Sequence, residues 1–223
     1  MDLALLNTSA IGFILRWIHL LAGVTWIGLL YYFNFVQGEY FKAADGGAKS
    51  DAIRKLVPRA LWWFRWGAMF TFLSGLGLLH FYSLRGFGIW TGATLGILMF
   101  LNVWLIIWPN QKIVIASADR VAGGGEALPA AAGALAKAGL ASRTNTLFSI
   151  PMLFLMASSR HLPQINPDIH DIGLLALAAV FGLIAVIEAN AIFGKQGPMA
   201  SVRGVIGSGF ALTAVLYLMI EWL

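Results

Sequence analysis

Six long apolar segments, separated by polar ones, constrain the fold of this chain more than any other feature. The hydrocarbon core of a bilayer is about 30 Å thick, and a helix needs roughly 20 apolar residues to cross it. Each segment is close to that length, and Pro109 should end the third one because proline disfavours helix continuation. The predicted spans are Ala10–Phe33, Trp62–Leu84, Ile89–Trp108, Arg143–Arg160, Ile172–Phe193 and Val205–Leu223.

The predicted fold is therefore an all-α integral membrane bundle, forming a single transmembrane domain over residues 1–223. Charged residues make up only 11% of the chain, whereas soluble domains average about 25%. The first apolar segment follows Asp2 and lacks the basic start of a signal peptide. We expect it to remain in the protein as a membrane helix.

Basic residues predict the orientation of the bundle. Eleven of the 15 Lys and Arg residues lie in the loops after the first, third and fifth spans. The opposite loops contain only Arg85 and Arg160, and Arg16 and Arg65 lie within spans. The positive-inside rule places the basic loops in the cytoplasm. Both termini then face the periplasm of a bacterial-type inner membrane. Because these loops account for the net charge of +5, we expect the lipid bilayer as a partner and no nucleic acid.

The chain contains no cysteine, which excludes disulfides, thiolate metal sites, iron–sulfur clusters and covalently attached c-type haem. Its four histidines are therefore the main candidate metal ligands. At ~1.5 Å per residue, His19 lies ~12 Å and His80 ~6 Å below the predicted outer surface. His161 and His170 lie at the outer ends of the fourth and fifth spans. All four histidines thus fall in the outer half of the bundle.

One stripe of the first span combines a charge, an imidazole and an aromatic ring. Arg16, His19, Gly23 and Trp26 follow each other at helical spacing, and charged residues within spans usually face a site or a partner. The stripe is interpreted as one wall of a cofactor or substrate site. The alternative is a helix–helix seam, with Arg16 reaching the surface and His19 bonded to a neighbouring backbone.

A b-type haem needs axial ligands on both faces of its ring, and the predicted pair is His19 with His161 or His80. Arg16 would bind a propionate or an anionic substrate, and Trp26 would pack on the ring. In the alternative interpretation, His80, His161 and His170 are ordinary interfacial residues. No His-x-His or His-x-x-x-His spacing supports a copper or zinc site.

Glu188 is the only carboxylate well inside a predicted span. It lies on the predicted cytoplasmic side, as does Arg65 in the second span. We interpret the two as a buried ion pair that joins spans two and five. A role for Glu188 in proton transfer is the alternative.

Four ordered patches of polar and aromatic residues resemble a known family. They are Arg16-Trp17-Ile18-His19 with Gly23 and Trp26-Ile27-Gly28; Trp63-Phe64-Arg65-Trp66 with Leu73-Ser74-Gly75; Asn102-Val103 with Pro109-Asn110-Gln111-Lys112; and Ser142-Arg143 with Asn145, Pro151-Met152-Leu153-Phe154-Leu155-Met156, His161 and Pro163. Together they resemble the N-terminal membrane domain of the membrane-bound urate hydroxylase (urate oxidase) family. The first helix also resembles the haem-dependent membrane protoporphyrinogen oxidase family.

The urate hydroxylase resemblance implies a helical membrane domain linked to urate oxidation, with electrons leaving through a c-type cytochrome. His19 and His161 match histidines of the family, whereas His80 does not. Trp62, Gly67 and Thr144 stand where the family has a histidine, an acidic residue and a histidine. Members of this type usually carry a C-terminal cytochrome c domain. No such domain precedes Leu223, so we expect the cytochrome to be a separate polypeptide.

The sequence therefore supports two functional hypotheses from different classes. The first is a membrane redox protein that holds haem b and passes electrons to a separate cytochrome c or oxidase. The second is a cofactor-free accessory subunit of a larger respiratory or transport complex. A weaker third hypothesis is a small-molecule permease with Asn102 and Glu188 lining the path, but the lack of internal repeats argues against it.

Overall fold

The computed structural model describes residues 8–162 and 165–222, and these residues form a bundle of helices without strands. The all-α prediction is therefore confirmed. Pro163 and Leu223 lie outside the described residues. The elements are α1 (Thr8–Tyr31), η2 (Tyr32–Gln37), α2 (Gly38–Ala43), α3 (Gly46–Lys55), α4 (Val57–Phe81), α5 (Phe87–Leu101), η3 (Asn102–Ile107), α6 (Trp108–Ala122), α7 (Ala131–His161), η5 (Ile169–Asp171), α8 (Leu174–Phe193), η6 (Gly197–Ala200) and α9 (Val202–Trp222).

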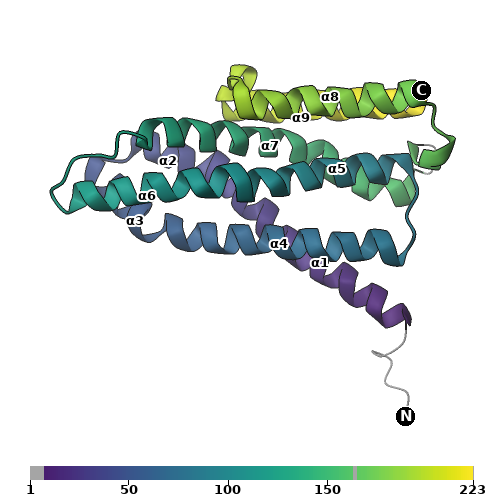
Figure 1. Cartoon of the computed structure of the whole chain (residues 1–223), viewed down its shortest axis with the longest axis horizontal. Helices are drawn as coiled ribbons and strands as arrows, with labels where there is room; N and C mark the ends of the chain where they lie inside the picture. Colours follow the sequence, from purple (N-terminus) through teal and green to yellow (C-terminus); the bar gives the residue numbers. More distant parts are fainter. Residues whose placement is uncertain (1–7, 163–164, 223) are drawn as a thin grey trace, which may run out of the picture.

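The long helices lie roughly side by side in three layers, as Figure 1 shows. α8 and α9 form one outer layer, α7 lies with α5 and α6 in the middle, and α4 lies on the other side. α1 crosses α4 diagonally, so its first turns lean away from the rest of the bundle. The start of α1 and the end of α9 lie at the same end of the molecule.

Four helical segments are long and apolar enough to cross a membrane: Ala10–Ala43, Phe87–Ala122, Leu174–Phe193 and Val202–Trp222. They contain the first and third predicted spans and most of the fifth and sixth. The second predicted span lies mostly within α4 and the fourth lies within α7, which are long helices but more polar. The structure thus supports a multi-pass membrane protein, while the count of six spans and the orientation stay predictions.

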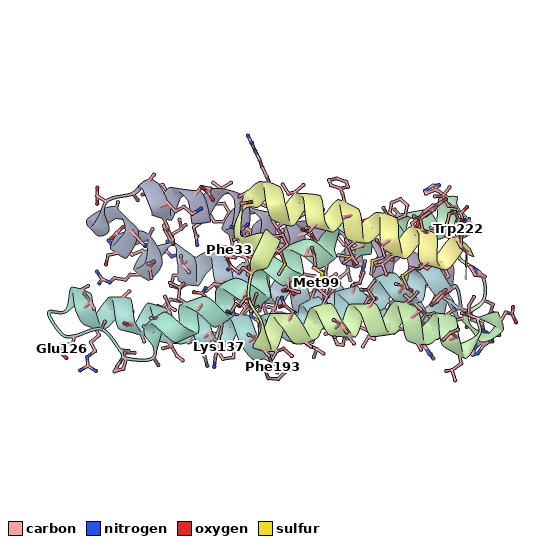
Figure 2. All side chains as sticks on the ribbon, turned by 90° about the horizontal axis from the view of Figure 1, so that it is seen from above. Phe33, Met99, Glu126, Lys137, Phe193 and Trp222 are labelled. Atoms are coloured by element: carbon pink, nitrogen blue, oxygen red, sulfur yellow. The ribbon has the colours of Figure 1, made fainter. Side chains whose placement is uncertain are left out.

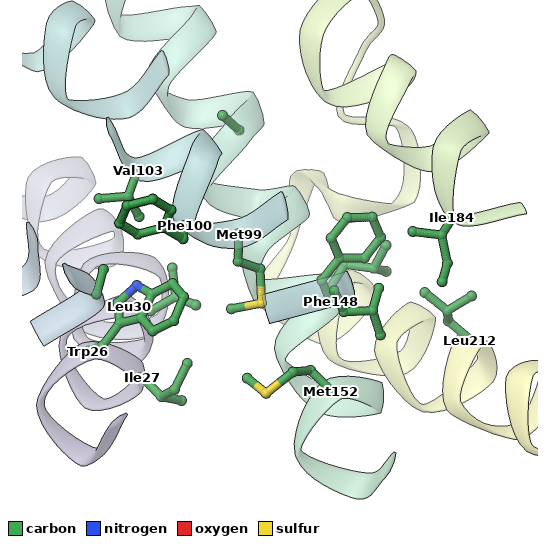
Figure 3. Packing of buried hydrophobic residues seen from close by; sticks show 14 of the residues in the cluster. Trp26, Ile27, Leu30, Met99, Phe100, Val103, Phe148, Met152, Ile184 and Leu212 are labelled. Carbon is green, nitrogen blue, oxygen red and sulfur yellow. The ribbon is translucent and has the colours of Figure 1, made fainter. Parts of the chain in front are cut away.

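α7 is the central helix of the bundle. It contacts α1, α5, α6, α8 and α9, and its middle turns are buried on every side, including four polar residues at Thr144–Ser149 that are fully buried. A helix enclosed by protein can carry such polar residues without exposing them to lipid. Figure 3 shows part of the core around it, where Met99 and Phe148 lie between Trp26 on one side and Ile184 and Leu212 on the other.

The helix predicted to end before Pro109 continues through it to Ala122, so that boundary is wrong. The π-helical segment η3 ends two residues before the proline, and a wider helical turn accommodates a residue that lacks an N–H group. The side-chain amide of Asn110 donates to the carbonyl oxygen of Ile106 at 2.7 Å, which satisfies a nearby backbone acceptor. α5, η3 and α6 therefore form one continuous rod.

A helical lobe projects beyond α8 and α9 at one end of the molecule. It consists of α2, α3, α6, the start of α4 and the start of α7, and Figure 2 shows Glu126 and Lys137 lying beyond Phe193, where α8 ends. An ion pair between Arg54 of α3 and Asp119 of α6, 2.9 Å long, joins two of its helices. Most of the basic residues in the predicted cytoplasmic loops belong to this lobe.

Candidate functional site

The site is built on an unusually close contact between α1 and α4. A Cβ atom placed on Gly67 of α4 would lie 3.1 Å from the backbone nitrogen of Trp26 and 3.3 Å from the carbonyl oxygen of Ala22. A Cβ atom on Gly75, two turns later, would lie 3.1 Å from Cε1 of His19. The two glycines therefore bring the backbones together and leave room for the imidazole beside α4.

His19 is held in one orientation by α4. Its Nδ1 lies 2.9 Å from the carbonyl oxygen of Thr71 and 3.3 Å from the hydroxyl of Ser74. A carbonyl oxygen only accepts hydrogen bonds, so Nδ1 carries the hydrogen and Nε2 keeps its lone pair. Metal-binding histidines are typically oriented in this way, with the second ring nitrogen donating to a carbonyl or carboxylate.

A cavity of about 660 Å³ lies between α1, α4, α5 and α7. Most of its lining is aliphatic, aromatic or glycine. The few polar groups on its wall include Arg16, His19, Trp26 and Thr71. A cavity with mainly apolar walls and a small number of polar groups is typical of a cofactor or ligand site.

The stripe predicted on the first span lines this cavity: Arg16, His19, Gly23 and Trp26 all contribute to its wall. Arg16 is exposed, and its guanidinium carbon lies 5.0 Å from the ring centroid of Tyr82. Trp26 is only 2% exposed, and its indole nitrogen has no hydrogen-bond partner among the described residues. The stripe thus offers the cavity a cation, an imidazole and a buried indole.

The other predicted ligands are not part of this lining. His80 lies in the last turn of α4 and His161 is the last residue of α7, and both side chains are exposed. His170, in η5, is also exposed. Nowhere in residues 8–162 and 165–222 do three or more His, Asp or Glu side chains gather as a metal site. The structure therefore brings together His19, Arg16 and Trp26, but not a second histidine.

The sequence analysis named two methionines only as part of a family patch and did not assign them to the site. Met152 and Met156 of α7 lie one turn apart and both line the cavity opposite α1. Figure 3 shows Met152 extending from α7 toward Ile27 and Trp26. Their spacing of four residues within one apolar patch was a signal, but methionine in an apolar helix is more often a gap filler.

Arg65 and Glu188, the predicted ion pair, have other partners in the structure. The guanidinium carbon of Arg65 lies 3.4 Å from the ring centroid of Trp108, and its Nε donates to the carbonyl oxygen of Leu61 at 3.2 Å. Glu188 accepts a hydrogen bond of 3.1 Å from the side-chain amide of Asn102. No ion pair between the two is formed, although both are described.

Asn102 and Asn145 extend the contact of Glu188 into a buried network. The amide of Asn102 also donates to Oδ1 of Asn145 at 2.9 Å, and the amide of Asn145 donates to the carbonyl oxygen of Met99 at 2.9 Å. Both asparagines are almost completely buried. The network joins α5, η3, α7 and α8 on the lobe side of the cavity.

The three departures from the family pattern occupy different environments. Trp62 is 48% exposed on α4, and Thr144 is fully buried and donates to the carbonyl oxygen of Leu140 at 3.2 Å. Gly67 lies where α1 and α4 are closest, so an acidic side chain at this position would meet the backbone of α1. The close approach of α1 and α4 therefore depends on the glycine at this position.

A family model described as urate oxidase N-terminal matches residues 77–220, which is more than half of the chain. The matched region contains the α5 and α7 walls of the cavity and the last two of the four sequence patches. The α1 wall, with Arg16, His19 and Trp26, precedes it. No curated protein and no solved structure matches the chain.

Proposed function

Since the chain belongs to the urate oxidase N-terminal family, as its ordered patches predict, we propose that it is the membrane domain of a urate-oxidising system. In this proposal it holds a b-type haem in the cavity between α1, α4, α5 and α7. The haem would supply one-electron chemistry, and the electrons of urate would leave to a separate c-type cytochrome or oxidase. The observation that carries the proposal is the geometry of His19 at the cavity wall.

The cavity and its donor groups suit a haem. Because Nδ1 of His19 donates to Thr71, its Nε2 is free to bind a metal. The apolar walls exclude water from the ring, and the volume of about 660 Å³ is on the scale of cofactor sites. The exposed guanidinium of Arg16 suits a carboxylate at the entrance, such as a propionate, or an anionic substrate.

Trp26 has a separate role in this proposal. Its indole lines the cavity, and its nitrogen is a buried donor without a partner among the described residues. Leaving such a group unsatisfied costs about 1–3 kcal/mol, and the nitrogen itself is closed to solvent. The flat ring also offers a surface on which a macrocycle packs.

A haem supplies an iron that accepts and releases one electron at a time, which suits the stepwise removal of electrons from an organic substrate. This chain would hold the group with the imidazole of His19, exclude water with its apolar walls and bind negative charge at the entrance with Arg16. The cavity lies in the half of the bundle that contains the start of α1 and the end of α4. With the basic lobe in the cytoplasm, this half faces the periplasm, where a c-type cytochrome can accept the electrons.

The test is the absorption spectrum of the protein purified in mild detergent, before and after reduction with dithionite. We expect a Soret band, with α and β bands that sharpen on reduction. His19→Ala should abolish these bands, whereas His170→Ala, at an exposed site away from the cavity, should leave them unchanged. Urate added to the oxidised protein should reduce the haem.

Two results would contradict the proposal. A His19→Ala protein that folds and keeps the full spectrum would exclude His19 as a ligand. A colourless wild-type protein, purified with haem supplied during expression, would exclude the cofactor altogether. Co-purification of partner chains with a colourless protein would then support the accessory-subunit function.

A further inference from the structure

A haem bound by His19 needs a second axial ligand if it is to be six-coordinate, and neither His80 nor His161 lines the cavity. Besides His19, the lining residues with a side chain known to bind haem iron axially are Tyr31, Met152 and Met156. The hydroxyl of Tyr31 is already hydrogen-bonded to Ser149 at 2.9 Å. The two methionine thioethers are thus the remaining candidates, and both belong to α7.

The contacts of Met156 place its side chain against α5. Its Cε lies 3.6 Å from the position of a Cβ atom on Gly96, and its Cγ lies 3.3 Å from that of a Cβ atom on Gly92. These two glycines, one turn apart on α5, leave the thioether chain room to lie along the cavity wall. His19 has a matching position against Gly75 on α4.

Gly75 and Gly96 lie at the same level of the bundle. The rings of Phe72 and Phe100 stack with centroids 4.1 Å apart, and α4 and α5 run in opposite directions. One turn after Phe72, α4 reaches Leu76, next to Gly75. One turn before Phe100, α5 reaches Gly96. Because the two helices are antiparallel, both steps rise by ~6 Å in the same direction. The imidazole and the thioether therefore reach the cavity at one level.

They also reach it from different walls. α1 packs mainly on α4, whereas α7 packs on α5, so the cavity separates the helix pair that carries His19 from the pair that carries Met156. Met152 lies one turn away but is only 4% exposed and belongs to the packed core. Met156 is partly exposed, so its side chain can rearrange at lower cost.

We propose that Met156 is the second axial ligand, opposite His19. This inference rests on the haem of the proposed function and adds the identity of the ligand on α7. A thioether is a neutral, soft ligand, and His/Met ligation raises the reduction potential of a haem. Such a haem would suit electron transfer toward a c-type cytochrome rather than the binding of small gases.

The experiment compares the full-length wild-type protein with Met156→Leu and Met152→Leu, each purified with its haem. Leucine conserves the volume of methionine but cannot bind iron. We expect the oxidised wild type to show the far-red charge-transfer band of thioether-ligated ferric haem. Met156→Leu should lose this band, and its reduced form should bind carbon monoxide. Met152→Leu should keep the band and exclude carbon monoxide, as the wild type does.

A third variant distinguishes the loss of an iron ligand from a change in side-chain packing. Met156→His should restore a six-coordinate haem without the far-red band, and its midpoint potential should be lower than that of the wild type. A coloured wild-type protein that lacks the band, or whose band survives Met156→Leu, would overturn the inference and leave the proposed function standing. A colourless wild-type protein would overturn both.

Discussion

At the scale of single residues, Gly67 determines how closely α1 approaches α4. The nearest atoms to a Cβ there belong to the backbone of α1, and backbone cannot move aside as a flexible side chain can. A Cβ atom at Gly67 would lie 3.1 and 3.3 Å from the backbone atoms of α1. It would therefore force the two helices apart by a few tenths of an ångström. The same seam positions Thr71 to hold His19, so its spacing controls the orientation of the imidazole.

Gly67→Ala should therefore destabilise the protein although alanine favours helices. Overpacking of this kind typically costs about 1–3 kcal/mol, and the change should be visible as a lower midpoint of thermal unfolding in detergent. Gly182→Ala in α8 is the matched control, because a Cβ atom at Gly182 meets no atom within 4 Å. Equal midpoints for the two variants would show that the α1–α4 seam tolerates a side chain.

At the scale of elements, the two π-helical segments occur where long helices carry polar side chains into the core. η3 begins at Asn102 and η2 contains Asn34, which donates to the hydroxyl of Ser142 at 2.8 Å. The carbonyl oxygen of Met99, at the junction of α5 and η3, accepts from the backbone N–H of Asn102 and also from the side-chain amide of Asn145. The buried asparagines therefore stabilise an irregular turn inside the bundle.

A double-mutant cycle on Asn102 and Asn145 would measure this stabilisation. We expect Asn102→Ala and Asn145→Ala to couple by ~0.6–1.7 kcal/mol, from the average to the maximum measured for hydrogen bonds inside a membrane bundle. The free energy of unfolding in mixed micelles is the quantity to measure. Additive effects of the two changes would mean that the 2.9 Å bond between them contributes nothing. Asn102 with Thr213, which bonds within α9, provides an uncoupled control pair.

At the scale of the whole molecule, the basic lobe and the cavity lie toward opposite ends. The positive-inside rule then predicts a cytoplasmic lobe and a cavity in the periplasmic half. η5 follows the end of α7 and so belongs to the same end as the start of α1.

The absence of cysteine makes this orientation directly measurable, because any introduced thiol is unique. A membrane-impermeant maleimide should label Asp171→Cys, in η5, on intact cells. Glu126→Cys, in the loop of the lobe, should react only after the membrane is opened. Both side chains are exposed, so accessibility within the protein is matched. The reverse labelling pattern would place the lobe outside and would contradict a periplasmic electron acceptor.

The sequence alone predicted that the chain is helical and which residues of the first helix share one face, which is now one wall of the cavity. The spacing of Arg16, His19, Gly23 and Trp26 specifies a shared face within a single helix, which is a local property. The opposite wall depends on which helix packs there, and no local pattern gives that. Met156 and Met152 were therefore recognised only in the structure, and Arg65 and Glu188 were paired although each has a nearer partner.

The boundaries were harder to predict than the helices. The sequence placed a helix end before Pro109, because a proline usually interrupts an α-helix. The π-turn η3 removes that conflict, so α6 continues the helix. Likewise, the alanine-rich stretch that begins α7 lies outside the predicted spans, yet it is helical and packs on α6 in the lobe.

The uninterrupted rod from Phe87 to Ala122 is 36 residues long. At ~1.5 Å per residue it measures roughly 50 Å, well beyond the ~30 Å hydrocarbon core. It is helical throughout, with the π-helical turn η3 in its middle, and it connects the lobe to the cavity. A protein that docked on the lobe and tilted the rod would shift Gly92 and Gly96 at the cavity. Linkage is reciprocal: a ligand in the cavity would, in turn, alter the affinity of the lobe for such a protein.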